Sequence, residues 1–220
     1  MSTTQTTEAD AQTQTESQSQ SRLPSVFVLG STVRSVRHTY TDESKGNGDR
    51  NPRMAVLPDG RHAGRVYTAG VLVNVEDVSN ESDEPYLKAE IIAGDERILV
   101  MAGQYQREAR ATLQQLNENN NLSIEPVTVG VTGKIRTYKN DGTVYANIRP
   151  DSLTEISQES YNNFCEQAAD DTAEASADIL DRAESGDDST EMMVWNTNHD
   201  TDEVKRILEN IDNNVLANLN

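Results

Sequence analysis

VTVGVTGKIRTYKNDGTVYANIRP, residues 127–150, is the most informative segment of the chain. Two runs in which apolar and polar residues alternate flank Asp141-Gly142. This dipeptide is typical of a tight β-hairpin, because glycine tolerates the positive φ that such turns need. A two-residue turn pairs Asn140 with Thr143 and thereby fixes the register of every further pair. The segment therefore predicts a long antiparallel hairpin.

The predicted register sorts the hairpin side chains onto two faces. The cross-strand pairs are Tyr138 with Tyr145, Ile135 with Ile148, Arg136 with Asn147, and Lys134 with Arg149. One face is apolar and consists of Val127, Val129, Val131, Ile135, Val144, Ala146 and Ile148. The other face combines cations with two aromatic rings and consists of Lys134, Arg136, Tyr138, Tyr145, Asn147 and Arg149. Cations and rings on one solvent-facing side are what a nucleic-acid strand requires.

The segments before this hairpin complete the pattern of a small barrel. Alternating residues predict strands over 65–78, with a bend at Gly70, over 86–94 and over 96–103. Apolar residues at intervals of three and four then predict a helix over 105–117. Three strands, a helix and two strands is the order of a five-stranded OB-fold barrel. The alternative is another small β-barrel with an inserted helix.

The flanking segments differ from the barrel in composition and periodicity. The first residues are low-complexity Ser, Thr and Gln, and predict disorder. Residues 26–41 and 53–61 read as strands added in front of the barrel, while the segments after 153 have helical spacing and are acidic. The predicted organisation is a disordered leader over 1–21, an OB-fold domain with an N-terminal strand extension over 22–153, an acidic helix over 154–185, a linker over 186–200, and an amphipathic helix over 201–220.

Residues that favour helix ends support these boundaries. Ser157 is placed to cap the start of the first C-terminal helix, and Gly186 to end it. Asp200 and Glu203 have the spacing of a capping box at the start of the last helix, expected over 201–218.

The charge of the chain is concentrated outside the predicted barrel. The net charge is −18, yet residues 22–150 contain 16 basic and 16 acidic side chains. Only five of the 19 basic residues are Lys. This acidic, lysine-poor composition favours a halophilic protein over a mesophilic acidic one. At about 1 M salt the Debye length is about 3 Å, so ring stacking would then contribute more to strand affinity than phosphate contacts do.

The sequence contains no motif of a known catalytic chemistry. His38, His62 and His199 lack metal-ligand spacing, and there is no phosphate loop or nucleophile elbow. Cys165 is the only cysteine and fits a small apolar position on a helix. The beginning of the chain has neither a signal peptide nor a membrane span. We therefore expect a soluble, cytoplasmic protein that is not an enzyme, with no cofactor, metal, membrane or small-molecule substrate.

Further candidate DNA-binding residues lie on the predicted second and third strands. Tyr86, Lys88 and Arg97 fall near the side that an OB-fold barrel presents to a ligand, with Tyr105 just after the third strand. The alternative is that these are ordinary β-surface residues, and that Tyr138 and Tyr145 form only a stabilising cross-strand pair.

Two apolar groups near the C-terminus are candidates for binding a partner protein. An isolated MMVW patch in the predicted linker can dock in a partner's groove or fold back onto the barrel. The last helix carries an apolar stripe that includes Val215. The candidate partner-binding residues are Met192, Met193, Trp195, Val204, Ile207, Leu208 and Ile211.

The chain also resembles a known family, through AGVLVNVE (69–76), VMAGQYQREA (100–109), VGVTGKIRTY (129–138) and VYANIRPDSL (144–153). These segments are similar to those of the haloarchaeal OB-fold proteins associated with replication protein A. By position, the matching residues are Gly103, Gln104 and Tyr105, then Lys134 and Arg136, then Ile148, Arg149 and Pro150. The Gln/Thr-rich leader and the Asn-rich segment 117–123 differ from that pattern.

The resemblance implies a role in DNA replication and repair, with single-stranded DNA and a replication protein A subunit as partners. Together with the residues of the hairpin it predicts a single-stranded DNA-binding or replication protein A-associated protein. Two alternatives stay open. One is an adaptor that binds replication protein A subunits without contacting DNA, and the other is an oligomer-forming structural OB-fold protein.

Overall fold

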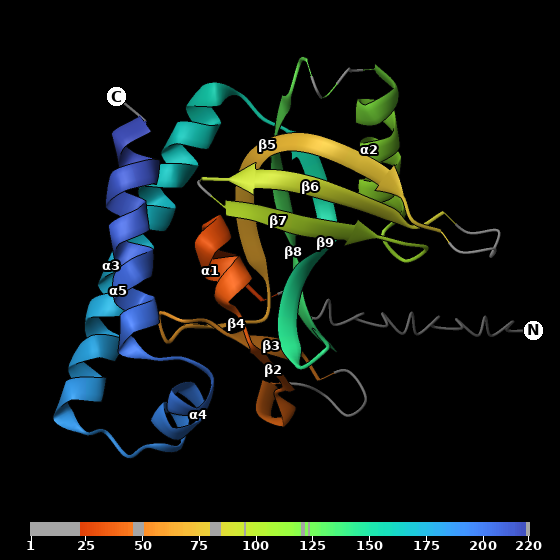
Figure 1. Ribbon diagram of the computed structural model, residues 1–220. Helices are drawn as coiled ribbons and strands as arrows, with labels where there is room; N and C mark the ends of the chain where they lie inside the picture. Colours follow the sequence, from red (N-terminus) through yellow and green to blue (C-terminus); the bar gives the residue numbers. More distant parts are fainter. Residues whose placement is uncertain are drawn as a thin grey trace, which may run out of the picture.

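A computed structural model describes residues 23–45, 51–79, 85–94, 96–119, 122 and 124–218 (Figure 1). The leader that we predict to be disordered, residues 1–21, lies outside the described residues. The described part consists of a β-barrel, a small second sheet and a layer of helices on one side.

The barrel has the strand order of an OB-fold, and it confirms the predicted fold class. Its order is β5-β6-β7-β9-β8, and β5 also pairs with β8 to close it. The parallel contact between β7 and β9 is a single bridge, from Val100 to Ile148. One helix, α2, lies between β7 and β8 in the chain. The elements are β5 (Val66–Asp77), β6 (Leu87–Ala93), β7 (Glu96–Ala102), α2 (Arg107–Asn119), β8 (Val127–Asn140) and β9 (Thr143–Glu155).

The β8–β9 hairpin, called the ribbon below, has the predicted register. Asn140 pairs with Thr143 and Tyr138 with Tyr145, and the more distant pairs follow in step as far as Gly133. Both turn residues have positive φ, 47° at Asp141 and 83° at Gly142. Because β9 pairs with β7 only at Ile148, the end of the ribbon extends beyond the barrel wall (Figure 1).

The N-terminal extension contains a helix where strands alone were expected. Its elements are β1 (Val26–Phe27), α1 (Gly30–Ser35), β2 (His38–Thr41), a 3-10 turn (Glu43–Lys45), β3 (Arg53–Val56) and β4 (His62–Ala63). The reason for α1 is tertiary packing, since Val33 and Val36 are buried in the barrel core. At Gly30 a Cβ would lie 2.5 Å from the carbonyl oxygen of Ala93, so only glycine permits this close approach. Strands β2, β3 and β4 form a separate antiparallel sheet.

The C-terminal segment forms three helices, of which α3 and α5 lie side by side (Figure 1). Ser157 caps α3 by accepting a hydrogen bond from the Ser160 amide at 3.1 Å. Gly186 ends α3 with φ 72°, as predicted. The elements are α3 (Gln158–Ser185), α4 (Thr190–Asn198), α5 (Thr201–Asn210), a π-helical turn (Ile211–Val215) and a 3-10 turn (Leu216–Asn218).

One prediction about this segment is wrong. The linker expected over 186–200 contains α4, whose start is capped by Ser189. The helix expected over 201–218 is helical over that whole range, but it changes after Asn210 from α-helical to π-helical and 3-10 turns.

The apolar residues form three clusters. The largest fills the barrel and includes Val33 and Leu113. The second joins α3 to the barrel wall through the rings of Phe27, Tyr67 and Phe164, and it also contains Cys165, whose thiol pKa is raised by burial. The third lies between the small sheet and the helices α3, α4 and α5. Among the described residues, no helix is both long enough and apolar enough to cross a bilayer.

Candidate nucleic-acid interface

An open cleft of about 600 Å³ lies on the outer side of the barrel, where the ribbon meets the end of β7. Its walls come from the loop between β5 and β6, the turn after β7, and the two strands of the ribbon. The lining residues are Val78, Pro85, Tyr86, Gly103, Gln104, Tyr105, Gln106, Lys134, Arg136, Arg149 and Asp151. The loop between the first two barrel strands, which forms one wall of this cleft, is one of the loops with which OB-folds bind oligonucleotides and oligosaccharides.

Three cations from the ribbon, Lys134, Arg136 and Arg149, line this cleft. Within the described part of the chain, no carboxylate forms an ion pair with any of them. Among the described residues that line the cleft, the one acidic side chain is Asp151, which is held by Arg65 at 2.6 Å. Burial lowers the pKa of Arg149 from its ordinary value. A guanidinium stays charged at neutral pH, so a bound anion would compensate charges that have no carboxylate partner among the described residues.

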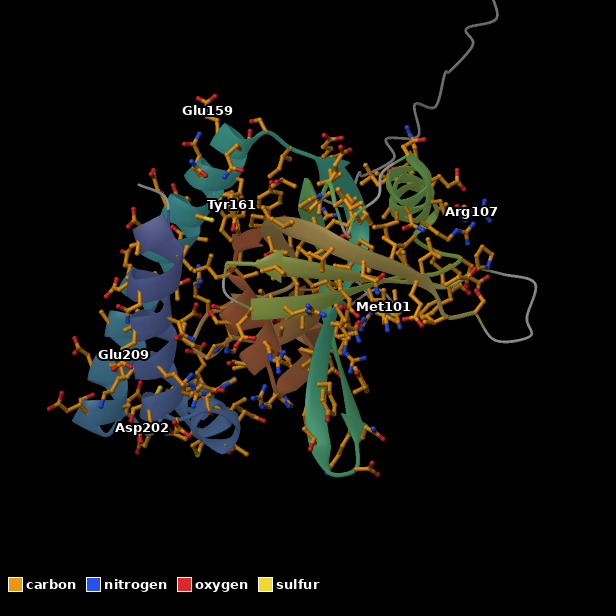
Figure 2. All side chains as sticks on the ribbon, turned by 45° about the horizontal axis from the view of Figure 1, so that its top comes forward. Met101, Arg107, Glu159, Tyr161, Asp202 and Glu209 are labelled. Atoms are coloured by element: carbon orange, nitrogen blue, oxygen red, sulfur yellow. The ribbon has the colours of Figure 1, made fainter. Side chains whose placement is uncertain are left out.

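Arg149 also organises an aromatic wall of the cleft. Its Cζ lies 4.9 Å from the centre of the Tyr86 ring, a cation–π geometry, and its Nη1 donates to the carbonyl oxygen of Met101 at 3.4 Å. Figure 2 shows Met101 at the junction between β7 and the ribbon. A Cβ at Gly103 would lie 2.7 Å from the Tyr86 ring, so this glycine lets the turn close against it. Tyr105, next in the turn, is 86% exposed.

Tyr138 and Tyr145 form a second aromatic group farther along the same side of the ribbon. Their ring centres are 5.4 Å apart and the ring planes are inclined by 21°, so the rings stack on each other. The exposed fractions are 46% and 44%. At about 3.3 Å per residue, Tyr138 lies about 13 Å from Lys134 along β8. The ring pair therefore lies on the same face of β8 as Lys134 and Arg136, farther from the barrel.

Three of the predicted DNA-binding residues do not belong to this surface. Lys88 pairs with its cross-strand neighbour Glu76 at 2.5 Å, and Arg97 pairs with Glu90 at 2.6 Å. Their charges are neutralised on the β6–β7 surface. Asn147 faces the ribbon side that we predicted, but its side chain is buried, and within the described residues its Oδ1 has no hydrogen-bond partner.

The structure adds one cation that the sequence did not indicate. Arg53 lies in β3 of the small sheet. The pKa of Arg136 is lowered mainly by the burial of Arg136 itself and secondly by the positive charge of Arg53. Nothing in the local sequence could reveal this, because 83 residues of chain separate the two positions and no pattern links the small sheet to the ribbon.

The predicted partner-binding residues are mostly used by the protein's own fold, which agrees with the alternative that the MMVW patch folds back. Trp195 is buried, and its Nε1 donates to the carbonyl oxygen of Pro58 at 2.8 Å. Met193 is 57% exposed and Leu208 is half-buried. The other buried members are Met192, Val204, Ile207 and Ile211.

Polar contacts reinforce the same packing. The buried His199 ring places Nδ1 2.8 Å from Glu203 Oε2 and Nε2 3.3 Å from the Val56 carbonyl oxygen. Glu203 also lies 3.7 Å from Arg37. Asp200 accepts from the Glu203 amide at 2.8 Å, which is one half of the predicted capping box. The carboxylate of Glu203 contacts His199 instead of completing the box.

The comparisons with known proteins identify no family. No protein-family model matches the chain, and no curated protein does. A replication protein A heterotrimer structure bound to single-stranded DNA is similar over 70% of this chain and 98% of that one, with 16% identity and a TM-score of 0.45. The N-terminal domain of PriB from Thermoanaerobacter tencongensis matches 43% of this chain and 97% of that one, with 12% identity and a TM-score of 0.30.

A third structure is the second single-stranded DNA-binding protein, SSBb, of Mycobacterium smegmatis. It matches 42% of this chain and 84% of its own, with 11% identity and a TM-score of 0.33. At such identities and scores, the assignment of the OB-fold rests on the strand order of the barrel. The resemblance to haloarchaeal replication protein A-associated proteins stays a prediction.

Proposed function

We propose that this protein binds single-stranded DNA across the cleft and along the ribbon. The observation that carries the proposal is a set of three cations without carboxylate partners among the described residues, beside exposed tyrosine rings, on a chain whose net charge is −18. We call the surface formed by these side chains the ribbon face; it consists of Lys134, Arg136, Tyr138, Tyr145 and Arg149. A surface built only for solubility in this chain would be acidic.

The chemistry of the ribbon face favours a single strand over a duplex. An exposed ring binds a base by stacking, and the faces of a base are free only when the strand is unpaired. Lys134 and Arg136 are two residues apart on the same side, and Arg149 lies opposite Lys134 on the other strand, so that they can contact neighbouring phosphates. Tyr86 and Tyr105 offer two further rings at the other end of the cleft.

The biological setting of the proposal is DNA replication and repair in a halophilic archaeal cytoplasm, with a replication protein A subunit as the protein partner. Support comes from the acidic, lysine-poor composition and from the family resemblance of the barrel segments. Figure 2 shows Glu159, Asp202 and Glu209 on the helical side of the molecule, away from Met101.

Fluorescence anisotropy with labelled oligo-dT tests the proposal. The wild type should bind, and Tyr138→Ala combined with Tyr145→Ala should weaken binding by about 1 to 3 kcal/mol per stacked base. The loss should persist at about 2 M KCl, where exposed charges are screened.

The matched control removes two cations that already have carboxylate partners. Lys88→Gln combined with Arg97→Gln should leave the affinity unchanged, while Lys134→Gln combined with Arg149→Gln should lower it at low salt. Absence of binding by the wild type at every salt concentration would contradict the proposal. If the protein then still co-purified with a replication protein A subunit, it would be the adaptor.

A further inference from the structure

A second open cleft, of about 670 Å³, lies between the small sheet and the N-terminal half of α4 (Figure 1). Its walls come from β2, the 3-10 turn after β2, the turn before β4, and α4. Its lining includes His38, Tyr40, Asp42, His62, Glu191 and Val194. No described residue lines both this cleft and the cleft beside the ribbon, so the two are separate sites.

The small sheet gives this second cleft an aromatic wall. His38 and Tyr40 are two residues apart on β2, so their rings lie on one face of the sheet. His62 in β4 lies on the same face, because it and His38 both pair with Val56. The Tyr40 hydroxyl is 2.7 Å from His62 Nδ1, and the His38 ring stacks on the Tyr40 ring with centres 6.2 Å apart. These contacts fix the orientation of the Tyr40 ring, and Val194 adds apolar surface from α4.

The charged side chains that line this cleft are acidic. Asp42 Oδ1 accepts hydrogen bonds from the Ser44 amide at 3.0 Å and from the Ser44 hydroxyl at 2.6 Å, which fixes the carboxylate. Glu191 is 69% exposed and lies 3.5 Å from Arg182, which forms its shorter ion pair, of 2.8 Å, with another carboxylate. Burial raises the pKa of Tyr40, and the negative charges of Asp42 and Glu191 raise it further. Among the described residues that line the cleft there is no Lys or Arg, so it offers negative charge beside aromatic rings.

We propose that this cleft binds an arginine side chain of a partner protein. A guanidinium group stacks on aromatic rings and donates two parallel hydrogen bonds to one carboxylate, which an ammonium group does not. The aliphatic part of an arginine side chain packs against apolar surface, which Val194 supplies. The ring of Tyr40 and the carboxylates of Asp42 and Glu191 provide the other contacts. The same carboxylates would repel a phosphate group, so the site lies outside the path of a DNA strand.

The surroundings of the cleft define the chemistry of the partner. Residues 151–220, most of which lie in the helical layer, contain 18 acidic and three basic side chains. Such a layer attracts a basic surface, while the cleft selects one arginine on it. High salt screens the attraction between exposed charges, so the contact with the rings should then contribute the larger share. The partner is therefore a protein with an arginine on an exposed basic segment, and this inference needs no contact with DNA.

An NMR titration of the full chain with two short basic peptides tests the proposal. The peptides differ only in that one contains arginine where the other contains lysine. The arginine peptide should shift the signals of Tyr40 and Val194, and it should bind about two- to fivefold more tightly than the lysine peptide. Asp42→Asn combined with Glu191→Gln keeps the size of both side chains and should lower the affinity for the arginine peptide about fivefold at low salt. Tyr40→Leu removes the ring and should abolish the preference for arginine.

The matched control removes two carboxylates elsewhere on the acidic helices. Glu159→Gln combined with Glu209→Gln changes two exposed positions and should leave the affinity for the arginine peptide almost unchanged. An equal loss of affinity in the two double variants would show attraction to the acidic surface as a whole, and would overturn the proposal. Equal affinity of the wild type for the two peptides, or peptide binding that leaves the cleft signals in place, would also overturn it.

A separate titration with oligo-dT distinguishes this site from the DNA path. Oligo-dT should leave the signals of Tyr40 and Val194 in place, whether or not it binds the ribbon face. If oligo-dT shifts these signals and the arginine peptide does not, the cleft belongs to the DNA path and the proposal is wrong. Circular dichroism checks that Tyr40→Leu keeps the fold, because Tyr40 also packs against the buried residues of the helices. If this variant unfolds, the two double variants decide the outcome.

Discussion

In the sequence, the ribbon face and the apolar residues of α4 and α5 are equally good candidates for an exposed binding surface. In the structure, the ribbon face is partly exposed and most of the apolar residues are buried. The ribbon face keeps two stacked rings about half exposed and three cations without carboxylate partners among the described residues. The apolar residues are covered by the protein itself, with Trp195 fixed to the backbone of Pro58. The ribbon face is partly exposed, whereas the apolar residues are packed within the fold.

The difference follows from what each kind of side chain gains by intramolecular contact. Burying apolar surface contributes about 25 cal/mol per Å² to the stability of the fold. A chain therefore covers its own apolar residues whenever another element can reach them. An exposed ion pair contributes only about 0 to 1 kcal/mol, so a cation can remain without a partner at little cost. The spacing of apolar residues therefore predicts an apolar face but not which element covers it. Unpaired cations in an acidic chain are the more informative signal of a binding surface.

The largest expected effect concerns the buried apolar residues of α4 and α5. Trp195→Ala should lower the free energy of unfolding by about 3 to 5 kcal/mol, because it leaves a cavity beside the small sheet. Urea denaturation measures it, and the folded fraction should bind oligo-dT with unchanged affinity. The exposed neighbour Met193→Ala serves as the control and should change stability by less than about 0.5 kcal/mol. Loss of partner binding at unchanged stability would show instead that Trp195 is an interface residue.

The next effect concerns the polar contact that holds α5 against the small sheet. Glu203→Gln should lower the free energy of unfolding by about 1.5 to 3 kcal/mol, the usual contribution of a hydrogen bond to a charged group. It removes the carboxylate that faces His199 at 2.8 Å. Glu209→Gln, on the exposed side of the same helix, is the matched variant and should be almost neutral. Equal effects from the two variants would contradict a specific role for the buried contact.

The smallest expected effect concerns a single cation of the ribbon face. Lys134→Gln should reduce the slope of log affinity against log salt by about 0.7, because one phosphate contact is lost. Lys88→Gln removes the same charge from a residue that is paired with Glu76, and its slope should match that of the wild type. Salt titrations of oligo-dT binding measure both. A larger change for Lys88 than for Lys134 would place the strand on β6 and β7.

Much of the barrel could be predicted because its information is local. The period-two alternation and Asp141-Gly142 determined the ribbon register, which the structure reproduces as far as Gly133. Helix α1 could not be predicted, since six residues, GSTVRS, have little helical preference and are held by packing against the barrel. Helix α4 was missed because its apolar residues are consecutive, although Ser189 is a capping signal that could have indicated it.

The candidate site was predictable only where it lies within one hairpin. Tyr138, Tyr145 and Lys134 followed from the ribbon alone. Separating Arg149 from Lys88 required the register between β5 and β6, which no tight-turn signal fixes and which places Glu76 opposite Lys88. Arg53 needed the docking of a separate sheet, which no sequence pattern specifies.

The most direct test of the central claim is an NMR titration that follows the backbone amide signals as oligo-dT is added. The signals of the ribbon over 134–149 and of the turn over 103–106 should shift, and those of α4 and α5 should not. Shifts confined to α4 and α5, or none at saturating oligonucleotide, would contradict the claim that the ribbon face binds the strand.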